Sequence, residues 1–212
     1  MSDLTPASSS LYSKHRLEAL SDGVFAVVMT LLVLELKPEL PQHSDNEAVA
    51  RVLHELARPL AGYAFAFAIT GVFWMLHHRN FTLLVHTNGP HTALTLAFLF
   101  AVTLLPLSVS IFLKARFSSL GQAVYFGNTA FIALTLLTSW LYANRAGLAD
   151  STTLPQAAAA LTRRMAAMSA LGLIAFAATW LGQQWLLLLA MPVILWVRFH
   201  GAPAPPIEPT DP

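Results

Sequence analysis

The sequence contains no cysteine among its 212 residues. It therefore has no disulfide bond, no thiolate metal site and no cysteine nucleophile. Two common catalytic patterns, Gly-x-Ser-x-Gly and His-Glu-x-x-His, are also absent. These patterns mark the nucleophile turn of many serine hydrolases and the zinc helix of many metalloproteases. The sequence thus offers no ready catalytic centre, and we do not expect an enzyme.

Charge is scarce as well. Asp, Glu, Lys and Arg make up 11% of the chain and hydrophobic residues 56%, with a mean hydropathy of +0.59. A soluble domain is nearer to about a quarter charged. Nearly all the charges lie between long apolar blocks, which indicates a protein that crosses a lipid bilayer several times. The net charge of +1, with no basic cluster, gives no sign of a nucleic-acid partner.

The two ends of the chain are polar. Residues 1–15 are rich in serine, and no small-residue cleavage site follows the first apolar block, so a cleaved signal peptide is not expected. Residues 201–212 are rich in proline. We expect both ends to be disordered and cytoplasmic. Residues 16–200 are then one membrane domain.

The apolar blocks predict six transmembrane helices in an all-α membrane protein, since about 20 apolar residues cross the hydrocarbon core. Pro106 predicts a kink or break in the third. The uncharged block 165–197 is too long for one helix, and the Gly-Gln-Gln turn between Trp180 and Trp185 divides it into the fifth and sixth. The first four spans are expected near residues 16–36, 59–76, 92–113 and 123–142.

The segment from Lys37 to Arg58 is polar, and a loop with a short helix, EAVARVLHEL, is predicted there. Its acidic residues would raise the local cation concentration near the end of the first span. An ordinary solvated loop explains the same residues equally well. Lys and Arg are slightly more numerous on the side that carries the two termini. This places both termini in the cytoplasm of a multi-pass cell-membrane protein.

The first span carries Arg16, Glu18, Ser21 and Asp22 near its start. An ionisable residue in a membrane span costs roughly 2.5–3.5 kcal/mol and is a functional hypothesis by default. Helical spacing also gives this span a continuous stripe. Periodicity alone favours packing of the stripe inside the monomer, and a pore wall is the sharper hypothesis. The stripe consists of Arg16, Leu20, Gly23, Val27, Thr30, Leu31 and Leu34.

The second span ends with Trp74, His77 and His78 on the same predicted side of the membrane. An indole N–H and an imidazole N–H can each donate to a carboxylate or a hydroxyl. We therefore predict a structural network of Arg16, Ser21, Asp22, Trp74 and His77. A metal site or enzyme centre using His77, His78 and Asp22 is a weaker alternative. Adjacent histidines do not share a helical face, and no further ligand pair completes a set.

The stretch from Arg16 to Leu36 resembles the first helix of the transmembrane protein 175 family, the lysosomal potassium channels and their prokaryotic relatives. That family opens this helix with Arg-x-x-x-Phe-Ser-Asp, and here Leu20 replaces the phenylalanine. The Trp-x-x-His-His ending of the second span and the Leu-Leu-Pro of the third also match. A single six-span repeat resembles the prokaryotic form.

The resemblance implies a homotetrameric potassium channel in the lipid bilayer, with no cofactor and with the first helix of each subunit lining a central pore. It implies an apolar gate at Val27, Leu31 and Leu34, a selectivity role for Thr30, and a packing role for the predicted network. No TVGYG-like filter loop is present. A proton-conducting channel of the same architecture is the alternative within this family.

Overall fold

The computed structural model describes residues 13–34, 36, 45–115, 118–150, 154–189 and 191–193. All the named elements among these residues are helical, and one isolated β-bridge joins Leu84 to Ala149. The predicted all-α fold is confirmed. The elements are α1 (Lys14–Val33), α2 (Asn46–Leu83), α3 (Gly89–Thr103), α4 (Leu105–Lys114), α5 (Ser119–Arg145), α6 (Pro155–Trp180) and η1 (Gln184–Leu189).

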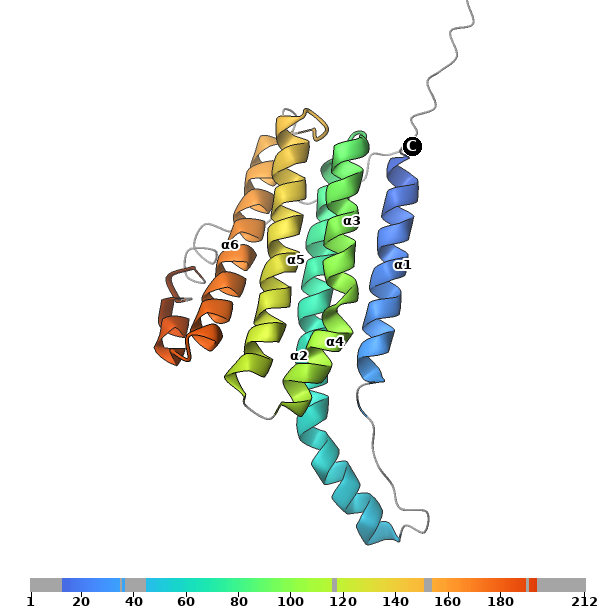
Figure 1. The fold of residues 1–212 in the computed structure, drawn as a ribbon. Coiled ribbons are helices and arrows are strands. Elements are labelled where there is room, and N and C mark those ends of the chain that lie inside the picture. The colour runs from blue at the N-terminus through green and yellow to red at the C-terminus, as the bar shows by residue number, and fades with distance from the viewer. Residues whose placement is uncertain are drawn as a thin grey trace, which may run out of the picture.

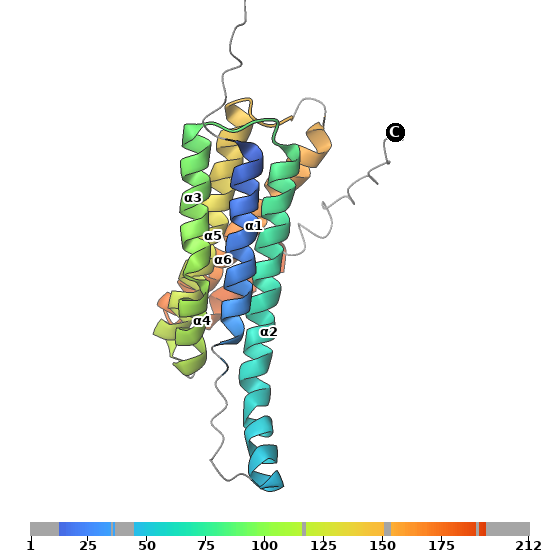
Figure 2. The same ribbon diagram turned by 90° about the vertical axis from the view of Figure 1, so that its right-hand side faces the viewer.

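The helices run side by side as a bundle, with α3 and α4 stacked end to end in one column (Figure 1). Figure 2 shows α1 lying in front of the gap between α3 and α2. Four helices of the described chain are long and apolar enough to cross a membrane: α2, the α3–α4 column, α5 and α6. Helix α1 is outside this group because its first half carries four charged residues. In place of the first part of the expected sixth span the structure has the six-residue 3-10 helix η1, followed by described residues 191–193, and residues 194–197 lie outside the described residues.

The α2 helix is longer than the sequence predicts. The Asp45 side chain caps its start by accepting a hydrogen bond from the Ala48 N–H at 2.7 Å. The helix then runs for 38 residues, with Pro59 inside it. The short helix expected at residues 47–56 is therefore present, but the expected boundary at residue 59 is wrong. Gly62, just beyond Pro59, lies against the side chain of Leu113 at the end of the bundle.

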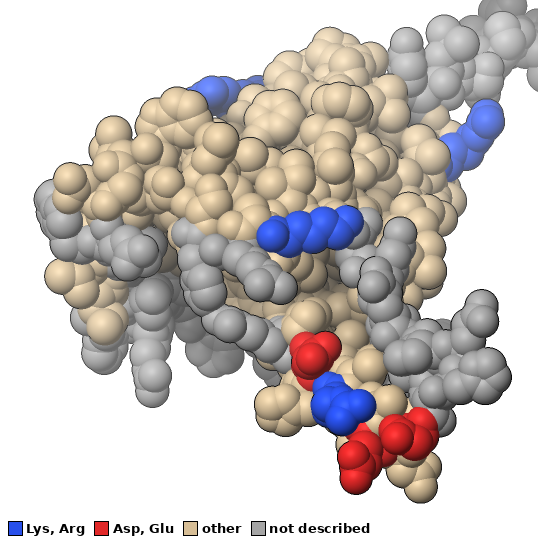
Figure 3. Space-filling view, turned by 60° about the horizontal axis from the view of Figure 1, so that its bottom comes forward, with Lys and Arg blue, Asp and Glu red and all other residues tan. Residues whose placement is uncertain are grey.

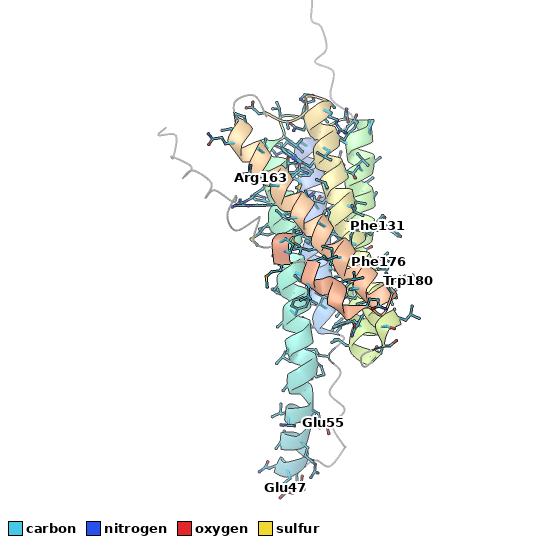
Figure 4. The ribbon with its side chains drawn as sticks, turned by 90° about the vertical axis from the view of Figure 1, so that its left-hand side faces the viewer. Glu47, Glu55, Phe131, Arg163, Phe176 and Trp180 are labelled. Atoms are coloured by element: carbon cyan, nitrogen blue, oxygen red, sulfur yellow. The ribbon has the colours of Figure 1, made fainter. Side chains whose placement is uncertain are left out.

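The first turns of α2 thus project beyond the other helices. Figure 1 shows α2 changing direction where it leaves the bundle, and prolines are a usual cause of such bends. Figure 4 labels Glu47 and Glu55 on the projecting part. In Figure 3 acidic side chains gather on this end of the molecule, with a basic patch between them. The remaining surface in that view is mostly uncharged.

The break between α3 and α4 confirms the expectation from Pro106. Helix α3 ends at Thr103 and α4 begins at Leu105. Pro106 lies in the first turn of α4, where its missing N–H costs no helical hydrogen bond. The column therefore continues across the membrane in two segments.

Small residues let α5 and α6 approach closely. A Cβ atom added to Gly172 would lie 2.9 Å from the Cα of Ala130, and one added to Gly127 would lie 3.1 Å from the ring of Phe176. Such small-residue contacts are typical of helix pairs in membranes. The Trp140 indole N–H also donates to the Thr162 hydroxyl at 2.7 Å. Figure 1 shows the two helices side by side. The pair of α5 and α6 packs against α2 and α3.

Candidate functional site

Helix α1 packs through one face only. The residues of this face are buried and point toward α2 and α3: Leu17, Ser21, Phe25, Val28 and Leu32. The opposite stripe is exposed, with exposed fractions of 56% for Val27, 41% for Leu31 and 61% for Leu34. The stripe identified in the sequence therefore does not pack inside the monomer. It is an open surface that needs a partner or a solvent.

Thr30 lies within this exposed stripe. Its hydroxyl donates to the carbonyl oxygen of Val27 at 2.7 Å. A hydroxyl that donates in this way keeps its lone pairs free to accept. The outward face of α1 is thus apolar, with one hydroxyl oxygen set among Val27, Leu31 and Leu34. Leu20, at the residue where the sequence departs from the family pattern, is also exposed, at 48%.

Two contacts join the start of α1 to the end of α2 as a ladder. The Trp74 indole N–H donates to Asp22 Oδ1 at 2.9 Å. One helical turn away, His78 Nδ1 lies 3.9 Å from Glu18 Oε1. The rings of Trp74 and His78 stack on each other, with centroids 5.5 Å apart and planes inclined by 19°. We call these four residues the α1–α2 ladder.

The contact between Asp22 and Trp74 was expected from the sequence, but the rung between Glu18 and His78 was not. The signal was present in the spacing. Glu18 and Asp22 are four residues apart, as are Trp74 and His78, so each pair lies on one side of its helix. Two antiparallel helices that meet at one such pair also meet at the other.

The rest of the predicted network is not assembled in the monomer. Ser21 is buried and donates to the carbonyl oxygen of Leu17 at 2.8 Å. Arg16 is exposed, and no hydrogen bond or ion pair links it to another described residue. His77 is buried among aromatic rings, with its centroid 4.9 Å from that of Phe98. His77 and His78 diverge because consecutive helical residues point about 100° apart.

The end of the bundle where α1 begins is tied together by backbone contacts. Lys14 Nζ donates to the carbonyl oxygen of Leu84 at 2.6 Å. The Val85 N–H donates to the Leu148 oxygen at 2.8 Å, and the Asp150 N–H to the Leu83 oxygen at 2.9 Å. These bonds join α1 to the α2–α3 turn, and that turn to the α5–α6 turn. The α1–α2 ladder therefore lies at an end of the bundle where hydrogen bonds join the helices and turns.

A metal centre finds little support in this arrangement. No group of three or more His, Cys, Asp or Glu side chains suited to a metal ion occurs in the part of the chain that the structure describes. His77 lies inside the bundle and His78 on its surface. What the geometry presents is an open apolar stripe on α1 beside a polar ladder.

Comparison with known proteins shows what this arrangement resembles. The family described as "Endosomal/lysosomal potassium channel TMEM175" matches residues 16–106, which run from α1 to the start of α4. The crystal structure of a lysosomal potassium-selective channel TMEM175 homolog from Chamaesiphon minutus has a TM-score of 0.65 to this chain and is 28% identical, covering 89% of this chain and 98% of that one. Over residues 16–106 the chain is similar to the TMEM175 family, and its fold is similar to that of this homolog.

Curated relatives within the family agree. A potassium channel of Chryseobacterium sp. (strain P1-3) is 35% identical over 113 residues, which is 53% of this chain and 56% of the relative. A potassium channel of Chamaesiphon minutus is 35% identical over 133 residues, which is 60% of this chain and 64% of the relative. The alignments thus span less than two thirds of either relative's length.

Two further likenesses mark the breadth of the family. The endosomal/lysosomal proton channel TMEM175 of Danio rerio is 40% identical over 76 residues, which is 32% of this chain and 14% of that protein. A crystal structure of the potassium channel MtTMEM175 has a TM-score of 0.62 at 17% identity, covering 87% of this chain and 92% of that one. The second likeness shows the fold alone.

Replacing Trp74 by phenylalanine tests the ladder. Trp74→Phe keeps a ring against His78 but removes the donor to Asp22, and we expect a loss of about 1–2 kcal/mol in the free energy of unfolding. The measurement is unfolding in detergent, with Asp22→Ala and the double variant completing a cycle. Trp180→Phe is the matched control, because Trp180 is exposed and packs against Phe176 through its ring. Strict additivity of the two losses would contradict the contact.

Proposed function

We propose that the protein is a potassium-permeable cation channel, in which α1 from each subunit of a homotetramer lines a central pore. The observation that carries this proposal is the open stripe of α1, whose residues Val27, Leu31 and Leu34 are exposed in the described chain. Four copies around an axis would turn this stripe inward and cover it. The description of two relatives as potassium channels supports the proposed conduction of potassium.

The gate in this proposal is apolar. Val27, Leu31 and Leu34 are spaced by four and three residues, so they follow one side of the helix and would form successive rings around the axis. An ion cannot exchange its hydration water for leucine methyl groups, so a narrow apolar ring stops conduction by excluding water. Opening consists of widening these rings until partly hydrated potassium passes.

Selectivity in this proposal comes from oxygen at one level of the pore. The Thr30 hydroxyl, held by its bond to the Val27 carbonyl oxygen, presents an acceptor between the apolar rings. Potassium loses its hydration water more cheaply than sodium, so a few weak oxygen ligands favour it. The preference is modest because the stripe offers few such oxygens.

The orientation follows from the charges at the two ends of the bundle. Lys14, Arg16, Arg79 and Arg145 lie at the end where α1 begins, which we place in the cytoplasm with both termini. All six predicted helices, α1 included, then cross the membrane. The projecting end of α2, with Asp45, Glu47 and Glu55, lies outside and raises the cation concentration near the mouth. Conduction is passive, so no cofactor or catalytic residue is needed.

Proton conduction through the same pore is the second candidate. It is favoured by the similarity to animal relatives described as proton channels, such as the Danio rerio protein. Flux from potassium-loaded liposomes, read with a potassium-sensitive and a pH-sensitive dye in parallel, separates the two functions. Potassium efflux while the pH difference across the liposome membrane is held constant supports the channel proposed here. Proton flux without potassium efflux supports the alternative.

Shortening the gate residues should make the pore leak. Leu31→Ala and Leu34→Ala widen the apolar rings, and we expect several-fold faster potassium efflux from liposomes than with the unaltered chain. Leu96→Ala is the matched control, since Leu96 is 47% exposed but lies on α3. If neither α1 variant changes the rate, the gate does not lie at these residues.

Removing the pore hydroxyl should reduce selectivity. Thr30→Ala deletes one weak oxygen ligand per subunit, and we expect the potassium-to-sodium permeability ratio to fall by roughly two- to fivefold, as about 0.5–1 kcal/mol of discrimination is lost. The reversal potential in planar bilayers gives the ratio. Thr103→Ala is the control, because the exposed Thr103 makes the same type of bond, to the Phe100 oxygen at 2.7 Å. An unaltered reversal potential in Thr30→Ala counts against this role.

A further inference from the structure

Three buried residues near the cytoplasmic ends of α2 and α3 have polar atoms without partners. Both ring nitrogens of His77, both amide atoms of Asn80, and Nε2 of His91 make no hydrogen bond to the described chain. Their exposed fractions are 3%, 0% and 0%. Buried polar groups in folded proteins are almost always paired, with protein or with ordered water. These atoms therefore call for a partner.

The three residues face one region. The ring centroid of His77 lies 4.6 Å from that of Phe81, and the Phe81 centroid lies 6.1 Å from that of His91. Phe81 is thus close to both histidine rings. Asn80 is three residues after His77, so it shares the same side of α2. We call His77, Asn80 and His91 the buried polar cluster.

The cluster bridges helices whose backbones do not touch. No Cα atom of α2 comes within 8 Å of a Cα atom of α3 in the described chain, so side chains fill the separation. Helix α1 covers this separation in Figure 2, and its Phe25 lies 6.2 Å from His77 and 5.9 Å from Phe98, ring to ring. The region is enclosed on the side of α1 as well.

The missing partner must both donate and accept. A neutral imidazole presents one N–H donor and one acceptor nitrogen, and the Asn80 amide presents two donors and an acceptor oxygen. The nearby hydroxyl of Thr95 donates to the His91 carbonyl oxygen at 3.0 Å, so it can only accept further bonds. Water meets every one of these requirements and is the usual partner of such buried groups.

We propose that ordered water molecules are bound between His77, Asn80 and His91. They link α2 to α3 beneath α1, where direct side-chain bonds are absent. This hydrated cluster lies inside one subunit and is separate from the stripe of α1. It does not depend on the proposed channel activity.

Hydroxyl-radical labelling of the full-length protein in lipid nanodiscs tests this proposal. Radiolysis of bound water produces radicals in place, so His77 and Phe81 should be oxidised although they are at most 3% exposed. Trp140 and Met165 are the internal controls, being 0% and 1% exposed and intrinsically more reactive. Trp140 donates directly to Thr162. Several-fold stronger labelling of His77 and Phe81 than of the controls is expected, and labelling no stronger than theirs overturns the proposal.

Variants trace the labelling to the cluster. Asn80→Leu, alone and with His77→Phe, removes hydrogen-bonding groups while keeping similar shapes, and we expect oxidation of Phe81 to fall several-fold. Asn128→Leu is the matched control, because the Asn128 amide donates directly to the Ser108 hydroxyl at 3.2 Å, and it should leave Phe81 unchanged. Persistent oxidation of Phe81 in the double variant overturns the proposal. The wild-type comparison stands even if a variant fails to fold.

Discussion

The structure depends on the one-sided packing of α1. Phe25, Val28 and Leu32 are each at most 2% exposed against α2 and α3, while Val27, Leu31 and Leu34 on the opposite stripe of the same helix are 41–61% exposed. A membrane helix gains little from hiding leucine from lipid, because lipid tails are equally apolar. The open stripe is therefore better explained by what it does when copies of the chain assemble than by folding of the monomer.

The polar contacts at one end of the bundle fix which side of α1 is open. The α1–α2 ladder sets the rotation of α1 about its axis, and Lys14 fixes its start on the α2–α3 turn. Charged groups are costly at membrane depth. Here they form bonds between helices, and these bonds fix the position of α1 relative to its neighbours. The proposed gate then occupies the uncharged half of the same helix, beyond the ladder.

Part of this arrangement could be predicted from the sequence. The break at Pro106 and the contact between Asp22 and Trp74 follow from the chemistry of single residues. The continuity of α2 through Pro59 could not be foreseen, because a proline usually ends or kinks a helix. Nor could the buried face of α1 be distinguished from its exposed face, since both faces are apolar. Whether His77 points into the bundle depends on how the helices are rotated about their axes. The α1–α2 ladder sets this rotation, and the sequence does not specify it.

The central claim is that the open stripe of α1 faces water in the assembled channel, and the absence of cysteine allows a direct measurement. Single cysteines placed at Thr30 and Leu34, with Val28 and Leu32 as buried controls, are exposed in liposomes to a charged, membrane-impermeant thiol reagent. The account predicts that the cysteines at Thr30 and Leu34 react and that modification blocks potassium flux, while the controls stay unmodified. Reaction at Thr30 and Leu34 only with a lipid-soluble reagent, without loss of flux, would place the stripe in the bilayer and contradict the account.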